Sequence, residues 1–236
     1  MPTYPLNLAT MKQIKLHYED NHIFIEDNHD LFIYDTGSPK SFSIGQRNPL
    51  NDEEIPYSFP GLPDAKKLSD FLNIPVIGLI GTDILNQYDH IIDLKTNTLT
   101  FSKQELKHQG HTLSLTLSNI LQGVPVLDAK IDTQLSKFIF DTGAQYSYYN
   151  DTIPKDSTPM GHITDYWPPI GTFKTQSYKA LVKLNDIETY IHFGVPPAEL
   201  SKLLNTLGTK GILGNELMRN RLTGYFPRRK ELVLQA

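Results

Sequence analysis

The chain has 236 residues, of which 39% are hydrophobic and 20% charged, so it is long enough to bury the core of one large domain or two small ones. The formal net charge of −4 argues against a nucleic-acid partner or an anionic membrane surface. Because the chain has no Cys, disulfides, thiolate metal sites and thiol catalysis are excluded.

The N-terminal segment Met1–Lys15 contains no continuous apolar stretch, so no signal peptide is visible and a cytoplasmic location is favoured. Its polar leader, Met1–Thr10, is expected either to add a strand or to form a disordered tail. The longest apolar stretch, Ile74–Leu85, is interrupted by Pro, Gly and Asp and is too short to span a bilayer.

The first half of the chain predicts strands and short helices joined by turns. Its Pro and Gly residues mark the turns, and Val, Ile, Thr, Tyr and Phe favour the strands. In chain order we expect a hairpin at Ile14–Ile25, a strand at Leu31–Tyr34, a helix from Gly61–Pro63 to Asn73, a strand at Gly78–Gly81, a helix at Thr82–Gln87 capped by Thr82 or Asp83, and a hairpin at Ile91–Phe101.

The second half repeats this order after a polar linker at residues 102–110. In chain order we expect a hairpin at His111–Ile131, a strand at Lys137–Phe140, a helix from Gly194–Pro196 to Asn205, a strand at Gly211–Gly214, a helix at Asn215–Asn220 capped by Asn215, and a hairpin at Leu222–Leu234. The basic cluster Arg228–Lys230 is expected to be the solvated tip of the last hairpin. We therefore predict an internal duplication with an N-terminal unit at residues 1–101 and a C-terminal unit at 111–236.

The most specific element of the repeat is the triplet Asp-Thr-Gly. It opens at Asp35 in the first half and at Asp141 in the second, 106 residues later, and each copy ends an apolar, β-prone run. One copy is an ordinary strand-to-turn sequence. Two copies in the same context, each followed by an apolar pair and a Gly before a short helix, form a far more specific pattern.

This pattern resembles the pepsin and retropepsin superfamily of aspartic proteases, and the resemblance covers nearly the whole chain. It implies an all-β fold with a few short helices, in which two acid-protease-like closed barrels form two lobes related by a pseudo-two-fold axis. The chain is similar to a retropepsin dimer fused into one polypeptide. It would be a monomeric aspartic endopeptidase acting on a peptide or protein substrate, without a cofactor or metal.

The resemblance makes Asp35 and Asp141 the catalytic pair. Two carboxylates that lie a few ångström apart cannot both ionise, so they share a proton and titrate as a unit. The ionised carboxylate can then take a proton from water while the protonated one donates a hydrogen bond to the scissile carbonyl.

The neighbours of each catalytic Asp would support its loop. As in the family, Thr36 and Thr142 would cross-link the loops. We expect Gly37 and Gly143 to permit the tight turns, and Ile80-Gly81 and Leu213-Gly214 to pass beneath the loops, where a side chain on the Gly would clash. The triplets are followed by Ser38 and Ala144, of which only Ser38 carries a hydroxyl. A hydrogen bond from Ser38 to the dyad predicts that Asp35 more often carries the negative charge and Asp141 the proton.

The two halves differ most after the triplet. The second half contains a long predicted hairpin with an aromatic tip at Gly161–Phe173, where the family has the flap that closes over substrate. The first half has only the polar loop Gly45–Pro60 at that place. We expect Tyr166 or Trp167 to contact substrate, although Trp167 could equally pack the hairpin on its lobe.

Other chemistries have little support in the sequence. There is no His-Glu-x-x-His metal motif and no glycine-rich nucleotide-binding motif, and no His-Asp pattern accompanies Ser147. The alternative to an enzyme is an inactive peptide-binding or interaction module that keeps the fold. The two intact triplets favour the enzyme, and the missing first flap favours the alternative.

Overall fold

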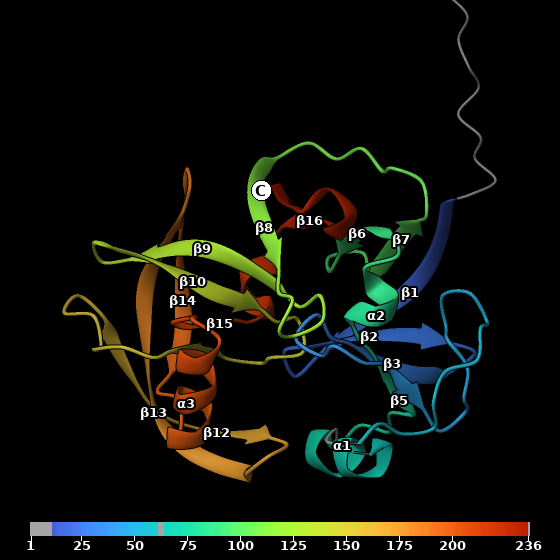
Figure 1. The fold of residues 1–236 in the computed structure, drawn as a ribbon, viewed down its shortest axis with the longest axis horizontal. Helices are drawn as coiled ribbons and strands as arrows, with labels where there is room; N and C mark the ends of the chain where they lie inside the picture. The colour runs from blue at the N-terminus through green and yellow to red at the C-terminus, as the bar shows by residue number, and fades with distance from the viewer. Residues whose placement is uncertain (1–10, 61–63, 236) are drawn as a thin grey trace, which may run out of the picture.

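The structure is a computed structural model that describes residues 11–60 and 64–235 (Figure 1). It is mostly β, with 48% strand and 13% helix, as the sequence predicts. Its 17 strands belong to one hydrogen-bonded sheet. The leader Met1–Thr10 and Gly61–Pro63, where the first longer helix was expected to begin, lie outside the described residues.

Over its described residues, the first half contains seven strands and two short helices. These are β1 (Met11–Glu19), β2 (His22–Asp27), β3 (Asp30–Tyr34), β4 (Phe42–Ser43), α1 (Ala65–Leu72), β5 (Gly78–Ile80), α2 (Thr82–Leu85), β6 (Asp89–Asp93) and β7 (Thr98–Ser102). Both predicted hairpins form, since β1 pairs with β2 and β6 with β7 in antiparallel register.

The second half contains ten strands, one α-helix and two 3₁₀ turns. These are β8 (His111–Leu117), β9 (Pro125–Ile131), β10 (Gln134–Phe140), β11 (Ser147–Tyr149), β12 (Thr158–Trp167), β13 (Gly171–Leu184), β14 (Ile187–Gly194), α3 (Ala198–Thr206), β15 (Gly211–Leu213), η2 (Asn215–Met218), β16 (Leu222–Phe226), η3 (Pro227–Arg229) and β17 (Glu231–Gln235). The predicted hairpins β8–β9 and β16–β17 are present.

Each triplet follows a strand that pairs in the same way in the two halves. Strand β3 lies parallel to β5, and β10 lies parallel to β15. A short strand then pairs antiparallel on the far side, β4 against β5 and β11 against β15. The two strands that lead to Asp35 and Asp141 therefore have equivalent neighbours.

The structure contains one closed six-strand barrel, in the second half. Strand pairing runs from β9 through β10, β15, β11, β14 and β13 and returns from β13 to β9. Over the described residues of the first half, β4 pairs with β5 alone, so no corresponding ring closes there. The expectation of two closed barrels is thus met for one of them, because the strands that close the ring belong to the extra hairpin region of the second half.

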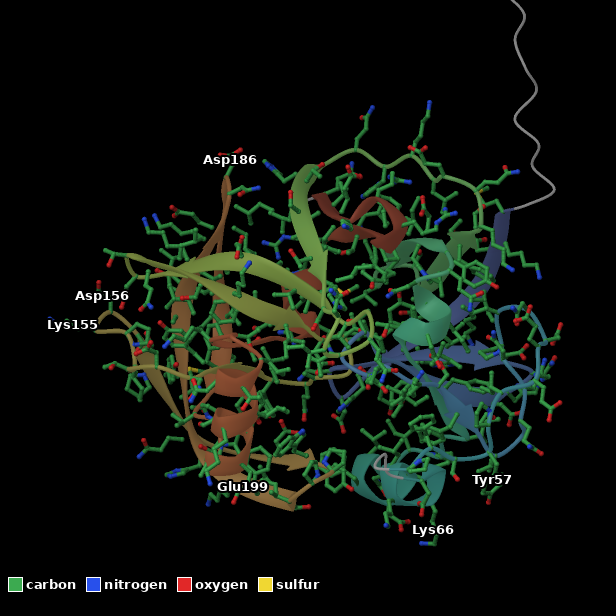
Figure 2. The ribbon with its side chains drawn as sticks, viewed as in Figure 1. Tyr57, Lys66, Lys155, Asp156, Asp186 and Glu199 are labelled. Carbon is green, nitrogen blue, oxygen red and sulfur yellow. The ribbon has the colours of Figure 1, made fainter. Side chains whose placement is uncertain are left out.

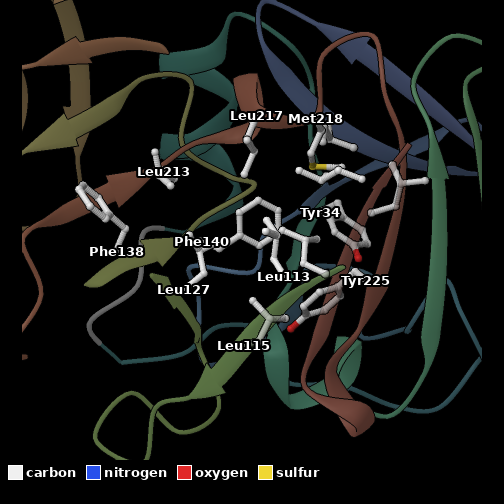
Figure 3. Packing of buried hydrophobic residues seen from close by; sticks show 14 of the residues in the cluster. Tyr34, Leu113, Leu115, Leu127, Phe138, Phe140, Leu213, Leu217, Met218 and Tyr225 are labelled. Atoms are coloured by element: carbon white, nitrogen blue, oxygen red, sulfur yellow. The ribbon is translucent and has the colours of Figure 1, made fainter. Parts of the chain in front are cut away.

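The last hairpin of each half pairs with the other half. Strand β6 of the first half lies antiparallel to β16 of the second, with Ile91 opposite Gly224, and β17 continues to β8. Apolar side chains pack between the two halves next to this sheet, including Tyr34, Phe140, Leu113 and Tyr225 (Figure 3). Tyr34 and Phe140 are fully buried, so the residues immediately before the two Asp are held in one core.

The short helices begin at Thr82 and Asn215, so their N-caps lie before the residues expected to cap them. Gly81 and Gly214 occupy the N-cap positions of α2 and η2, without side-chain caps, so the expected caps Thr82 or Asp83 and Asn215 are wrong. The Asp83 carboxylate instead accepts hydrogen bonds from Ser41. The N-cap of α1 is Asp64, whose carboxylate accepts from the Lys67 amide.

The basic cluster lies at the tip of the last hairpin, and Arg228 and Lys230 are exposed there as expected, but its two Arg residues also bind a buried acid. Arg228 and Arg229 both pair with Asp89, which is completely buried, and Arg228 Nη2 lies 2.8 Å from Asp89 Oδ1. The amide of Leu106 donates to the same carboxylate at 2.9 Å. The expected linker therefore packs against an ion-pair cluster that joins β6 to the C-terminal hairpin.

We predict that Asp89→Ala lowers the free energy of unfolding by about 3 kcal/mol, because it leaves two guanidinium groups without their shared carboxylate. Urea denaturation measures this change. The matched control is Asp128→Ala, which removes a pair with Lys137 whose side chains are both more than half exposed, and which should cost less than about 1 kcal/mol. Equal effects of the two changes would contradict the buried cluster.

Candidate active site

The backbone of each triplet Asp is fixed by the strand beside it. The amide of Asp35 donates to the Ile80 carbonyl at 3.0 Å, and the amide of Asp141 donates to the Leu213 carbonyl at 2.9 Å. These bonds continue the parallel pairing of β3 with β5 and of β10 with β15. Each Asp therefore begins its turn from a rigid strand end.

The following turn holds one oxygen of each carboxylate. Asp35 Oδ1 accepts from the amides of Gly37 at 2.8 Å and Ser38 at 3.0 Å. Asp141 Oδ1 accepts from the amides of Gly143 at 2.9 Å and Ala144 at 3.1 Å. Both side chains are locked in one orientation by their own loops.

The two carboxyl groups lie against each other's loops. A Cβ built on Gly37 would lie 2.2 Å from Asp141 Cγ, and one on Gly143 would lie 2.6 Å from Asp35 Cγ. Neither Gly has a positive φ, so the expected reason for them, a turn that only Gly can adopt, is wrong. They are needed because any side chain there would occupy the space of the opposite carboxylate.

The two loops are cross-linked by their Thr residues, as expected. Each Thr amide donates to the other Thr hydroxyl at 3.0 Å. The Thr36 hydroxyl donates to the Phe140 carbonyl and the Thr142 hydroxyl to the Tyr34 carbonyl, each at 2.8 Å. Both Thr side chains are buried. Four hydrogen bonds therefore hold Asp35 and Asp141 at one place although 106 residues separate them in the sequence.

A glycine passes beneath each loop, also as expected. A Cβ on Gly81 would lie 2.6 Å from the Ser38 carbonyl oxygen, and one on Gly214 would lie 2.6 Å from that of Ala144. The Gly81 amide donates to the Ser41 hydroxyl, and the Gly214 amide donates to the hydroxyl of Ser147 at 3.0 Å. Ser147 is therefore a buried support of the loop.

The dyad binds protons more tightly than ordinary aspartates do. Burial, followed by the charge of Asp141, raises the pKa of Asp35 well above its usual value. Burial also raises the pKa of Asp141, although hydrogen bonds from Asp35 and from the Gly143 and Ala144 amides oppose that rise. One proton is consequently retained by the pair at pH values where an isolated Asp is ionised.

Ser38 does not reach the dyad with its side chain. Its hydroxyl donates to the Lys40 carbonyl at 2.9 Å and accepts from the Lys40 amide, closing a local turn. We expected a hydrogen bond from this hydroxyl to keep Asp35 ionised and leave the proton on Asp141. That hydrogen bond is absent, so the expected reason for the division of roles is wrong. Ser38 supports Asp35 through its backbone amide, as Ala144 does for Asp141.

The dyad lies in a cavity of about 240 Å³ that is lined by residues of both halves, including the two triplet loops. The hairpin of β12 and β13 contributes Tyr166, Trp167 and Pro168 to its lining, and α1 contributes Phe71. The rings of Phe71 and Tyr166 stack with centroids 4.8 Å apart. Figure 1 shows the end of β12 beside α1. This stacked pair therefore joins α1 of the first half to the β12–β13 hairpin of the second half at the cavity.

The predicted hairpin forms with its tip at residues 168–170, and Tyr166 and Trp167 both line the cavity. Trp167 also packs on an apolar cluster that includes Leu200 and Leu204, so its two expected roles coexist. In the described part of the first half, the loop at residues 45–60 has a single bridge, Arg47 to Glu54, and no such hairpin.

The cavity residues that were not anticipated from the sequence include His22, Phe71 and Asp165. His22 is the first residue of β2 and follows the turn of the first hairpin. The sequence predicted this hairpin but gave no reason to place it at the site. Phe71 lies on the predicted helix that ends at Asn73, but its place at the cavity depends on tertiary packing. Asp165 adjoins Tyr166, so the hairpin prediction was the one signal that could have pointed to it.

Within residues 11–60 and 64–235, no cluster of His, Asp or Glu is arranged to hold a metal ion, and no helix is long and apolar enough to cross a membrane. The sequence matches no model of a known protein family, and no curated protein matches it significantly. The geometry of the site is therefore the basis for the function.

We predict that Thr36→Val destabilises the protein by about 2–4 kcal/mol, because it leaves the Thr142 amide and the Phe140 carbonyl buried without partners. Thr36→Ser keeps the hydroxyl and should recover most of this loss. Thermal and urea unfolding of the two variants give the comparison. A Val variant as stable as the Ser variant would show that the cross-link contributes little.

Proposed function

We propose that the protein is an aspartic endopeptidase that hydrolyses peptide bonds with water activated by Asp35 and Asp141. The observation that carries this proposal is the position of the two carboxyl groups, which face each other on a cavity and are held by cross-linked loops. A pair with raised pKa values that keeps one proton provides a base and an acid at the same place.

We further propose that the chain forms two lobes, residues 1–101 and 111–236, related by a pseudo-two-fold axis through the dyad, and that it acts as a monomer. The reciprocal Thr bonds, the matching carboxylate–amide bonds and the matching strand pairings support this relation. One chain supplies both Asp residues, so a second copy is not needed to complete the site.

In the proposed reaction the dyad acts as an acid and a base together. The ionised carboxylate removes a proton from a water molecule while the water oxygen bonds to the scissile carbonyl carbon, and the protonated carboxyl donates a hydrogen bond to the carbonyl oxygen. When the resulting tetrahedral intermediate collapses, the C–N bond breaks and the leaving nitrogen takes a proton from the dyad. The pair returns to its singly protonated state, so protons balance over the cycle.

The hairpin of β12 and β13 would cover the bound peptide. Its tip already contacts α1 through the Tyr166–Phe71 stack, so a peptide that enters the cavity must separate or slide past these rings. Closure of the hairpin over substrate would then exclude water from the dyad. The second half supplies this cover, and α1 supplies the opposing wall.

The other candidate is a peptide-binding module without activity. The observation that favours it is the lack of a second covering hairpin at residues 45–60. An intact dyad argues against it, because a binding module has no use for two carboxylates whose mutual repulsion must be offset. The peptide-cleavage experiment described next separates the two candidates.

We predict that the wild-type protein cleaves a mixed peptide library between acidic and neutral pH and that pepstatin inhibits the cleavage. Asp35→Asn and Asp141→Asn should each lower kcat/KM by about 10²–10⁴-fold, because each removes one of the two proton-transfer roles. The matched control, Asp186→Asn, removes an equal charge from an exposed turn that lies at the edge of the molecule in Figure 2 and does not line the cavity, so this variant should retain activity. Cleavage that survives in both dyad variants would overturn the proposed function.

A further inference from the structure

The cavity around the dyad has an unbalanced charge. Its lining includes three Asp, namely Asp35, Asp141 and Asp165, but neither Lys nor Arg. The proton shared by the dyad lowers the charge of that pair to about one negative unit. Asp165 adds a further acid that the proposed reaction does not use.

Asp165 is 8% exposed and is held at the end of β12. Its Oδ2 accepts from the Tyr148 hydroxyl at 2.5 Å, and its Oδ1 accepts from the Tyr166 amide at 2.7 Å. Within residues 11–60 and 64–235, no cationic side chain pairs with it. A buried carboxylate with two neutral donors and no cation is an unusual and costly arrangement unless a ligand completes it.

Aromatic rings surround this carboxylate. Tyr148 and Phe173 line the same cavity with ring centroids 6.1 Å apart, and Trp167 lies two residues along the strand from Asp165. Aromatic faces attract cations and also pack on the apolar stem of a long basic side chain. The surroundings of Asp165 therefore suit the head and the stem of a Lys or Arg residue.

A second buried polar side chain, His22, lines the same cavity. His22 is 6% exposed, and its Nδ1 lies 2.9 Å from the Asp20 carbonyl oxygen. Among the residues that the structure describes, none bonds to its Nε2. Burial lowers the pKa of His22, so its ring is neutral and Nε2 is an acceptor. A substrate with hydrogen-bond donors would therefore meet acceptors at both His22 and Asp165.

A simpler role for Asp165 is to fasten the hairpin through Tyr148. That role requires an acceptor for the Tyr148 hydroxyl and the Tyr166 amide but does not require a charge. An Asn at this position has nearly the same shape and can keep both contacts without a charge. Its carbonyl oxygen can accept from the Tyr166 amide, and its NH2 group can donate to the Tyr148 hydroxyl oxygen, because a Tyr hydroxyl can accept as well as donate. Asp165→Asn therefore separates charge recognition from fastening.

We propose that Asp165 and the aromatic rings beside it form a subsite for a basic side chain, so that the enzyme selects peptides with Lys or Arg next to the scissile bond. This inference rests on the proposed function and adds the class of substrate to it. Asp165 acts as a specificity-determining residue, and the reaction itself remains with Asp35 and Asp141.

Binding can be measured without catalysis, because Trp167 is the only Trp in the chain and lies in the cavity. In an Asp35→Asn background, Trp fluorescence follows titration with pairs of short peptides that carry Arg or its neutral isostere citrulline at one of the two central positions. At one of these positions we expect the Arg peptide to bind at least about tenfold more tightly. Adding Asp165→Asn should reduce this ratio to about twofold or less, and adding Asp186→Asn should leave it unchanged.

The same peptide pairs test cleavage in the protein with an intact dyad. We expect the ratio of kcat/KM for Arg over citrulline to fall about tenfold in Asp165→Asn. Equal binding and equal cleavage of both peptides by the wild type would overturn the subsite while leaving the proposed protease intact. Preferential Arg binding by a protein that cleaves no peptide would support the subsite and overturn the proposed activity.

Discussion

The site depends on the crossed hydrogen bonds between Thr36 and Thr142. Two carboxylates repel each other when both are charged, and burial makes the charged forms less favourable still. The loops that carry them stay together because each Thr satisfies buried backbone groups of the other loop. The cross-link therefore keeps the two carboxyl groups together and buried although their charged forms are unfavourable there. Because the charged forms are unfavourable, the pKa values of both groups are raised.

The two halves contribute matching loops around the dyad but different elements to the sides of the cavity. Both supply an Asp, a Thr cross-link and a glycine that passes under the loop. Among the described residues, the second half alone closes a barrel and extends the β12–β13 hairpin. The first half contributes α1, whose Phe71 stacks on Tyr166 at the cavity. If the protein is the proposed peptidase, this asymmetry would give the two ends of a bound peptide different surroundings, and Asp165 on the hairpin would make that difference electrostatic as well as steric.

The sequence predicted the features that depend on local pattern and repetition. The hairpins, the triplet strands and the flap hairpin follow from alternation and turn residues, and the repeat identified Asp35 and Asp141 as one pair. Features that depend on three-dimensional contact were missed. The Ser38 hydroxyl bonds to Lys40 and not to the dyad, and Arg228 pairs with the buried Asp89. Asp165 lines the cavity because of the position that β12 takes in the folded protein.

The central claim is that Asp35 and Asp141 share one proton. Carboxyl ¹³C resonances of Asp-labelled protein, followed from acidic to neutral pH, test it directly. The account predicts that one carboxyl of the pair stays protonated well above the ordinary Asp value of about 3.9, and that Asp141→Asn lowers the pKa of Asp35 because the neighbouring charge is gone. Independent titration of both groups near that ordinary value, unchanged for Asp35 in the variant, would contradict it.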